Sequence, residues 1–237
     1  MIELMKITLV IAPINEKTYF MPCVLKHCSP KRIEEETSKQ TVAPIVIKLP
    51  GECIPRGFFC ALACSLMSQW KFHRERRKLV DVFKNFIHFD IEGMDCSVAV
   101  VDSFYFISMH VFGDCDREGC REILKDVKLS IKTVATKHSY DESLIMSYDK
   151  DINFLCLCGE ASEHIATLTT RGKLKLKCSM DQPLTLTKKH AVWFNDEQYS
   201  NWEQQQSPAS TMTTKGTIGR KFCNYITHAV VHFEHAT

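Results

Sequence analysis

The sequence has no long hydrophobic run, and charge of neither sign dominates it. The apolar stretch at residues 57–70 is shorter than the ~20 apolar residues that a membrane-spanning helix needs. Thirty Lys and Arg residues stand against 28 Asp and Glu residues, a formal net charge of +2. So small a charge does not attract nucleic acid or an anionic membrane surface. We therefore expect protein partners and neither nucleic acid nor membrane.

The sequence also lacks the short motifs of common catalytic sites. It contains no G-x-x-x-x-G-K-[S/T] phosphate-binding loop, no G-x-S-x-G and no H-E-x-x-H. The two carboxylates of Asp114 and Asp116 are better explained as residues at the N-terminus of a helix. His88 and His110 fall on expected strands, and we interpret them as sheet-surface or partly packed residues. The sequence therefore predicts a protein that is not an enzyme and does not bind or hydrolyse GTP.

A secretory signal is not recognisable at the N-terminus. Glu3 stands where positive charge is expected, and Pro13 ends the first apolar run without a small-residue cleavage pattern. Twelve cysteines are many, but a secreted disulfide scaffold would be shorter and would carry a signal peptide. We interpret the cysteines as reduced thiols of a cytoplasmic protein.

The uncharged stretch after Arg56 predicts a buried helix over about residues 55–70. Pro55 suits the first helical position, where its missing N–H costs no hydrogen bond. Cys60 and Cys64 are four positions apart, so on a helix their two thiolates could share a metal. We interpret them instead as small packing residues. Three- and four-residue steps place one set of large apolar residues on a single face of this helix: Phe59, Leu62, Leu66 and Trp70.

The pattern then changes to alternation with a period of two. Apolar and polar residues alternate across about residues 84–112, interrupted by tight polar turns, which predicts an antiparallel meander. A helical apolar face follows over about residues 117–138, and short strand-like runs follow over residues 141–195. We therefore predict an α+β fold with an antiparallel meander, packed helices and a small β-rich C-terminal part.

Three polar segments carry weaker signals. Residues 26–43 are predicted to be a surface loop, and residues 71–85, with their cluster of Arg and Lys, a solvated helix face or loop. Residues 196–237 are predicted to hold a Gln-, Ser- and Thr-rich linker and a tail with no identified partner.

Several of these segments, in this order, resemble the COR region of Roco proteins, which follows the Roc GTPase in the leucine-rich-repeat kinases and their relatives. The resembling stretches are "YFMPCVL", "APIVIKLPGECIPRGFFCALACSLM" and "NFIHFDIEGMDCSVAVVDSFYFISM", followed by a Cys/His/Trp pattern at residues 156–193. The residues that carry the match are Tyr19, Phe20, Pro22, Leu25, Pro55, Gly57, Phe58, Leu62, Trp70 and the Phe86–Phe89 strand.

The resemblance implies a truncated member or fragment without the GTPase. Residues 1–25 would end the first COR half, residues 44–140 would form the core of the second half, and residues 141–195 would form a Cys- and His-containing part. In the family, the COR region relays the nucleotide state and contributes to dimerisation. The implied function is a non-catalytic scaffold or dimerisation module in signalling, which associates with itself or with a Roc–COR protein.

Four residues of the β-rich part suggest a different function. Cys156, Cys158, His164 and Cys178 are a legitimate ligand set for tetrahedral zinc, and they would make this part a small zinc-stabilised protein-binding domain. Against this, most structural zinc sites use C-x₂₋₄-C spacing rather than C-x-C. We therefore favour packing residues without a metal, and we expect sulfurs and imidazole nitrogen to lie within about 4 Å of one another if zinc binds instead.

Overall fold

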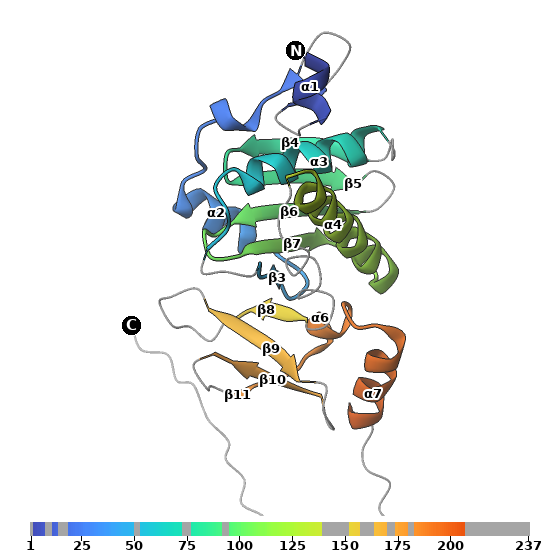
Figure 1. The fold of residues 1–237 in the computed structure, drawn as a ribbon. Coiled ribbons are helices and arrows are strands. Elements are labelled where there is room, and N and C mark those ends of the chain that lie inside the picture. The colour runs from blue at the N-terminus through green and yellow to red at the C-terminus, as the bar shows by residue number, and fades with distance from the viewer. Residues whose placement is uncertain are drawn as a thin grey trace, which may run out of the picture. The chain divides into compact units, whose positions relative to one another are not determined.

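The computed structural model describes residues 2–7, 11–13, 19–49, 53–72, 77–91, 95–138, 152–156, 164–169, 174–179 and 183–206 (Figure 1). Within these ranges the chain has the predicted α+β fold: an antiparallel sheet, packed helices and a β-rich later part.

Nine strands of the described residues form one sheet, in which every neighbouring pair is antiparallel. The spatial order of the strands is β11-β10-β9-β8-β3-β7-β6-β5-β4. Their bounds are β3 (Ile45–Ile47), β4 (Arg77–Phe83), β5 (Phe86–Ile91), β6 (Cys96–Asp102), β7 (Ile107–Gly113), β8 (Asn153–Leu155), β9 (Ile165–Thr169), β10 (Lys175–Cys178) and β11 (Pro183–Leu184). Two further short strands, β1 (Ala12–Pro13) and β2 (Tyr19–Phe20), pair with each other.

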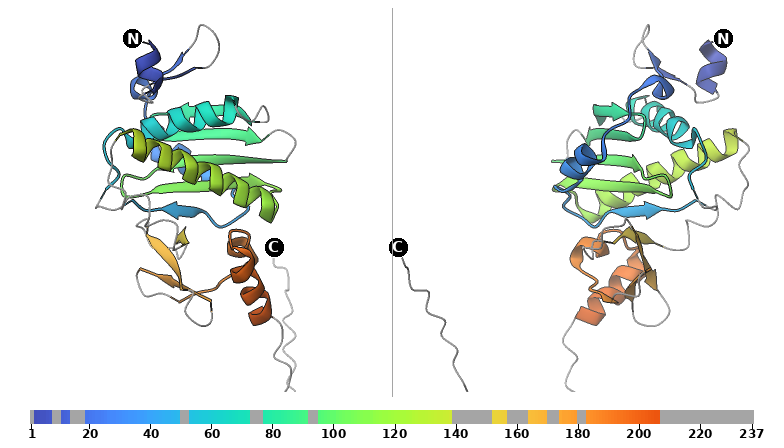
Figure 2. Two further views of the ribbon diagram at one scale, coloured as in Figure 1. Left: turned by 45° about the vertical axis from the view of Figure 1, so that its right-hand side comes forward. Right: turned by 90° about the vertical axis from the view of Figure 1, so that its left-hand side faces the viewer.

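The helices cover both faces of this sheet. Figure 2 shows α3 and α4 on one face of strands β4–β7 and α2 on the opposite face. The helices of the described residues are α1 (Ile2–Ile7), the 3-10 helix η1 (Pro22–Val24), α2 (Pro30–Thr37), α3 (Phe58–Phe72), α4 (Arg117–Lys137), α6 (Lys188–Ala191) and α7 (Asp196–Gln206).

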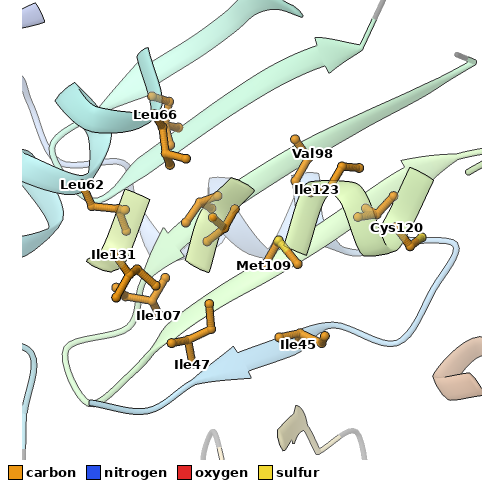
Figure 3. Packing of buried hydrophobic residues seen from close by; sticks show 14 of the residues in the cluster. Ile45, Ile47, Leu62, Leu66, Val98, Ile107, Met109, Cys120, Ile123 and Ile131 are labelled. Atoms are coloured by element: carbon orange, nitrogen blue, oxygen red, sulfur yellow. The ribbon is translucent and has the colours of Figure 1, made fainter. Parts of the chain in front are cut away.

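Alternation along the strands divides their side chains between two hydrophobic clusters. Val98 and Met109 belong to the larger cluster, between the sheet and helices α3 and α4 (Figure 3). Their neighbours Ala99 and His110 are paired across β6 and β7 and face the α2 side. The smaller cluster on that side consists of Cys28, Phe86, Ala99 and Val101, with Ile33, Phe83 and Phe112 packed against it. The predicted period of two therefore places a core on each face of the meander.

The central strand β3 joins the meander to the later strands. Ile45 pairs with Met109 on one side and with Phe154 on the other, so that β3 bonds to both β7 and β8. All three of its residues are buried. The β-rich part predicted for residues 141–195 thus continues the same sheet.

Helix α4 begins and packs as the sequence predicts. Asp116 is its N-cap, and the carboxylate accepts a hydrogen bond from the N–H of Gly119 at 2.7 Å. This confirms the interpretation of the acidic pair as residues of a helix N-terminus. Helix α3 begins at Phe58, so Pro55 lies before the helix and not at the predicted first helical position, while the observed end at Phe72 is close to the predicted one. Its Trp70 donates a buried hydrogen bond to Asp126 of α4 at 3.2 Å, so a polar contact supplements the apolar packing of the two helices.

The edge strand β4 corrects one of the predictions. Residues 77–83 form a strand that pairs with β5, with a register shift between Leu79 and Asp81, rather than a helix face or loop. The Arg and Lys residues before it obscured a run of β-branched and aromatic residues that favours a strand. Residues 73–76, which belong to the same basic segment, lie outside the described residues.

Two segments predicted as loop or linker contain helices because they carry capping signals. In α2, Pro30 opens the helix and the Ser29 hydroxyl accepts from the N–H of Arg32 at 3.3 Å. Before α7, the side chains of Asn195 and Gln198 each accept a hydrogen bond from the other's backbone N–H, at 2.8 and 3.1 Å. This reciprocal pattern is a capping box, a specific signal for the start of a helix within a Gln-rich segment.

A third correction concerns the end of the segment at residues 141–195, for which only short strands are predicted. Only Pro183–Leu184 are in a strand, and Thr187 caps the short helix α6. The first part of that segment, residues 141–151, and residues 207–237 of the predicted linker and tail lie outside the described residues.

The Trp70–Asp126 contact leads to a prediction about stability. Asp126 is buried and also accepts from Gln69 at 3.3 Å, while Gln69 accepts from Ser130 at 2.6 Å. Trp70→Phe keeps an aromatic ring in the core but removes the indole N–H. We expect the free energy of unfolding to fall by about 1–3 kcal/mol in urea denaturation, because a buried carboxylate loses a donor.

The matched control is Trp202→Phe on α7. The indole nitrogen of Trp202 is buried without a hydrogen-bond partner in the described part of the chain. Its replacement therefore removes an aromatic N–H without breaking a hydrogen bond, and a smaller loss is expected. Equal losses in the two variants would mean that the Trp70–Asp126 bond contributes nothing beyond ring packing.

His110 leads to a prediction about pH. Its ring lies 2.7 Å from the Gln40 side chain and 3.0 Å from the Ser108 hydroxyl, and burial lowers its pKa from 6.5 to about 4. Below pH ~6.5 the His110 imidazole binds a proton in the unfolded chain, whereas in the folded chain it stays unprotonated until the pH approaches about 4. The contribution of His110 to stability is therefore complete above about pH 6.5 and falls as the pH drops towards 4, by about 2 kcal/mol at pH 5.

His110→Gln should consequently flatten the pH dependence of unfolding, measured by urea denaturation at pH 7 and pH 5. Part of the dependence remains, because burial also lowers the pKa values of His88 and His190. The exposed His138 supplies the control variant, His138→Gln, which should keep the wild-type slope. If the free energy of unfolding of His110→Gln depended on pH as strongly as that of wild type, His110 would not be a source of the pH dependence.

Candidate functional site

Three of the four candidate metal ligands come together on adjacent strands. Cys156 follows β8 and lies opposite His164 at the start of β9, where its N–H donates to the carbonyl of His164 at 2.8 Å. Cys178 ends β10 and pairs with Ala166 of β9. The fourth candidate, Cys158, lies outside the described residues.

The strand register explains the convergence. Phe154, Ala166 and Leu176 are buried in the larger hydrophobic cluster. Each candidate ligand is also buried and lies two residues from one of them: Cys156 from Phe154, His164 from Ala166 and Cys178 from Leu176. Because side chains alternate across a strand, residues two apart share a face, and the antiparallel register aligns these faces on β8, β9 and β10.

The ligand atoms of this cluster are close enough to share one ion. One ring nitrogen of His164 and the two sulfurs all lie within 4.8 Å of one another. The two sulfurs are 3.4 Å apart, and all three residues are buried. Two cysteines and a histidine, on or next to three adjacent strands, therefore lie close together, and we name these three residues the Cys/His cluster.

A cavity of about 300 Å³ adjoins this cluster. Cys156 lines it together with Ala166 of β9, Leu176 of β10 and His190 of α6. The ring of His190 lies at 4.9 Å from that of Phe154 in an edge contact, and burial lowers its pKa. Sequence patterns do not predict this cavity, because its walls come from segments far apart in the chain.

A second group of buried thiols lies at the start of α4. Cys115 contacts Cys120 and Cys96, and the hydrogen bond with Cys120 together with burial raises its pKa to about 12, although the contact with Cys96 acts in the opposite direction. A thiol with so high a pKa stays protonated and unreactive near neutral pH. Cys64 on α3 is also buried, and burial raises its pKa, which agrees with its interpretation as a packing residue. No disulfide joins the cysteines in the ranges that the structure describes.

The turn between β6 and β7 presents a pair of exposed aromatic rings. Phe104 and Tyr105 are 62% and 61% exposed, and their ring centroids lie 5.1 Å apart in an edge-to-face contact. Phe104 has a φ of 67°, a conformation that non-glycine residues rarely adopt. We call these two residues the aromatic tip.

Backbone contacts hold the aromatic tip in this conformation. The N–H of Phe104 donates to the Asp102 carboxylate at 3.0 Å, and the Phe104 carbonyl accepts from the N–H of Ile54 at 2.6 Å. Phe106, the third aromatic residue of the segment, is buried. The sequence showed the three aromatics but not which of them face solvent.

Comparison with known proteins returns no match. No protein-family model, no curated protein and no solved structure is significantly similar to the chain. No helix in the described ranges reaches the length and hydropathy of a bilayer-spanning segment.

Proposed function

We propose that the chain is a non-catalytic scaffold of a Roco-like signalling protein, similar to a COR region, and that it associates with a second copy of itself through the aromatic tip. The observation that carries this proposal is the exposure of Phe104 and Tyr105 side by side. Aromatic side chains are enriched among the residues that contribute most to binding in protein interfaces. The resemblance to COR regions supplies the type of partner.

Backbone strain at Phe104 supports a role for the tip in binding. A non-glycine residue with positive φ costs about 1–2 kcal/mol, and glycine or asparagine would relieve that cost. Strain of this kind is concentrated at functional sites, where the surrounding contacts maintain it. A large apolar side chain held in this conformation and exposed to water contributes little to the fold, so a bound partner accounts for it better.

Other exposed apolar positions offer a poorer surface. The edge strand β4 carries the exposed Val80, but the register shift beside it and the ion pair from Arg32 of α2 to Asp81 obstruct pairing with a further strand. Leu4, Val24 and Leu129 are aliphatic residues on α1, η1 and α4. Among the exposed large apolar residues that the structure describes, only those of the aromatic tip are two aromatic rings in contact with each other.

A second copy of the chain is a suitable partner for such a surface. In a twofold dimer the same patch meets itself, so a charged patch would repel its own copy, whereas uncharged rings do not. The net charge of +2 adds little long-range repulsion between copies. A Roc–COR protein that presents a similar surface is the alternative partner, in keeping with a cytoplasmic location.

A second candidate function is a small zinc-stabilised protein-binding domain. The convergence of Cys156, His164 and Cys178 favours it. This candidate concerns a different part of the sheet from the aromatic tip, so the two functions are tested separately.

The association is tested with Phe104→Gly. Glycine accepts a φ of 67° without strain, so we expect stability to stay within about 1 kcal/mol of wild type, while dimerisation weakens by at least about tenfold. Analytical ultracentrifugation over a concentration series measures the dimerisation constant, and urea denaturation measures stability. Tyr105→Ser should weaken dimerisation in the same way.

Leu129→Ser is the matched control, because it removes an exposed apolar side chain from α4 and leaves the tip intact. It should dimerise as wild type does. A wild-type chain that stays monomeric at high concentration, and that also fails to bind a purified Roc–COR protein, refutes the proposal. Binding to the Roc–COR protein alone would replace the second copy with that partner.

A further inference from the structure

We propose that the Cys/His cluster is a zinc site that stabilises the sheet, with Cys156, His164 and Cys178 as its three protein ligands and water in the fourth tetrahedral position. The proposal goes beyond the scaffold function and does not depend on it. It rests on the positions of three buried side chains from β8, β9 and β10, whose ligand atoms lie within 4.8 Å of one another.

The sulfur–sulfur separation is within about 0.4 Å of that expected around a tetrahedral ion, and the nitrogen lies within 4.8 Å of both sulfurs, against the expected ~4 Å or less. With Zn–S bonds of ~2.3 Å and Zn–N bonds of ~2.0 Å, two sulfurs on one zinc ion lie about 3.8 Å apart, and a sulfur and a nitrogen slightly less. The two sulfurs here are 3.4 Å apart, and the nitrogen lies within 4.8 Å of both. Small rotations of the side chains would therefore bring all three atoms to bonding distance of a single ion.

A disulfide between the two cysteines fits the topology less well. Strand β9 lies between β8 and β10, so roughly two strand spacings of about 4.8 Å separate their backbones. A disulfide needs Cα atoms closer than about 7 Å, whereas an ion adds two further bonds between the sulfurs. The reduced pair therefore suits a bridging metal better than a covalent bond.

Ligand chemistry and charge select zinc. Thiolates with imidazole are typical of tetrahedral Zn²⁺ sites, whereas Mg²⁺ and Ca²⁺ require oxygen ligands. On binding, Cys156 and Cys178 release their protons, and the two thiolates balance the charge of the ion while His164 stays neutral. A neutral assembly is the arrangement that a buried position tolerates, because an unbalanced charge would be costly there.

The site has a route of entry and a structural purpose. Cys156 lines the cavity of about 300 Å³, which would give an ion an approach to this ligand. Strands β10 and β11 are only four and two residues long and lie at the edge of the sheet. An ion bound by ligands on or next to β8, β9 and β10 would connect these three strands, and its binding free energy would add to their stability.

The test uses the full chain, purified under reducing conditions and then analysed by native mass spectrometry for bound zinc. We expect one zinc per chain. Removal of the zinc and addition of Co²⁺ should give the visible absorption of tetrahedral cobalt together with thiolate-to-cobalt charge transfer. Competition with a chromophoric chelator should show at least about a tenfold loss of zinc affinity in Cys156→Ser and Cys178→Ser, because even loss of a residue behind a ligand costs 10–100-fold.

Two further variants keep the test valid if a serine disrupts folding. His164→Leu places an apolar side chain at the buried position and should also lose affinity. His164→Cys exchanges one ligand for another and should keep the zinc and strengthen the charge-transfer band. Cys115→Ser, in the thiol group at the start of α4, is the matched control and should bind zinc as wild type does.

Three results would overturn the proposal. The first is a wild-type chain that binds no zinc when zinc is supplied in excess, and the second is retention of zinc with wild-type affinity by every ligand variant. The third is a Cys156–Cys178 disulfide, found by mass spectrometry of the chain purified without reductant.

Discussion

The sheet depends on three buried residues at its centre. Strand β3 is the single connection between the meander β4–β7 and the later strands β8–β11 among the described residues, and it bonds to β7 on one side and β8 on the other. Its Ile45 and Ile47 also pack with Met109 beneath α4 (Figure 3). A strand that is buried on both faces and paired on both edges fixes the register of everything beyond it. The Cys/His cluster owes its geometry to this register, because the strands that carry it extend outward from β3.

The two parts of the sheet differ in how they are stabilised. Helices α3 and α4 cover the meander, and a buried hydrogen bond between Trp70 and Asp126 joins them. The later strands are shorter, and the segment after the small helix α6 is joined to the residues before β3 by Trp193, whose indole N–H donates to the carbonyl of Ala43 at 2.8 Å. Short strands with little helical cover need an additional source of stability, which the proposed zinc site would provide.

Local patterns in the sequence predicted much of this arrangement. The period of two before Phe112 and the apolar face of α3 fixed the meander and its main helix. The predictions were wrong for the segments of α2 and α7, because their polar composition suggested a loop or linker although their capping residues favour helices. The joining of both parts by β3 could not be predicted, because three apolar residues do not reveal which strands they pair with. The same limit applied to Cys156 and Cys178, whose proximity depends on the register of strands far apart in the chain.

Hydrogen exchange measured by mass spectrometry, with and without a zinc chelator, tests most directly whether the later strands are a metal-stabilised extension of a self-sufficient core. Removal of the metal should abolish protection in β8, β9 and β10, while β5–β7 and α4 keep theirs, because the meander and its helices hold their own core. Unchanged protection in β8–β10 after the metal is removed, or an equal loss throughout the sheet, would contradict this account.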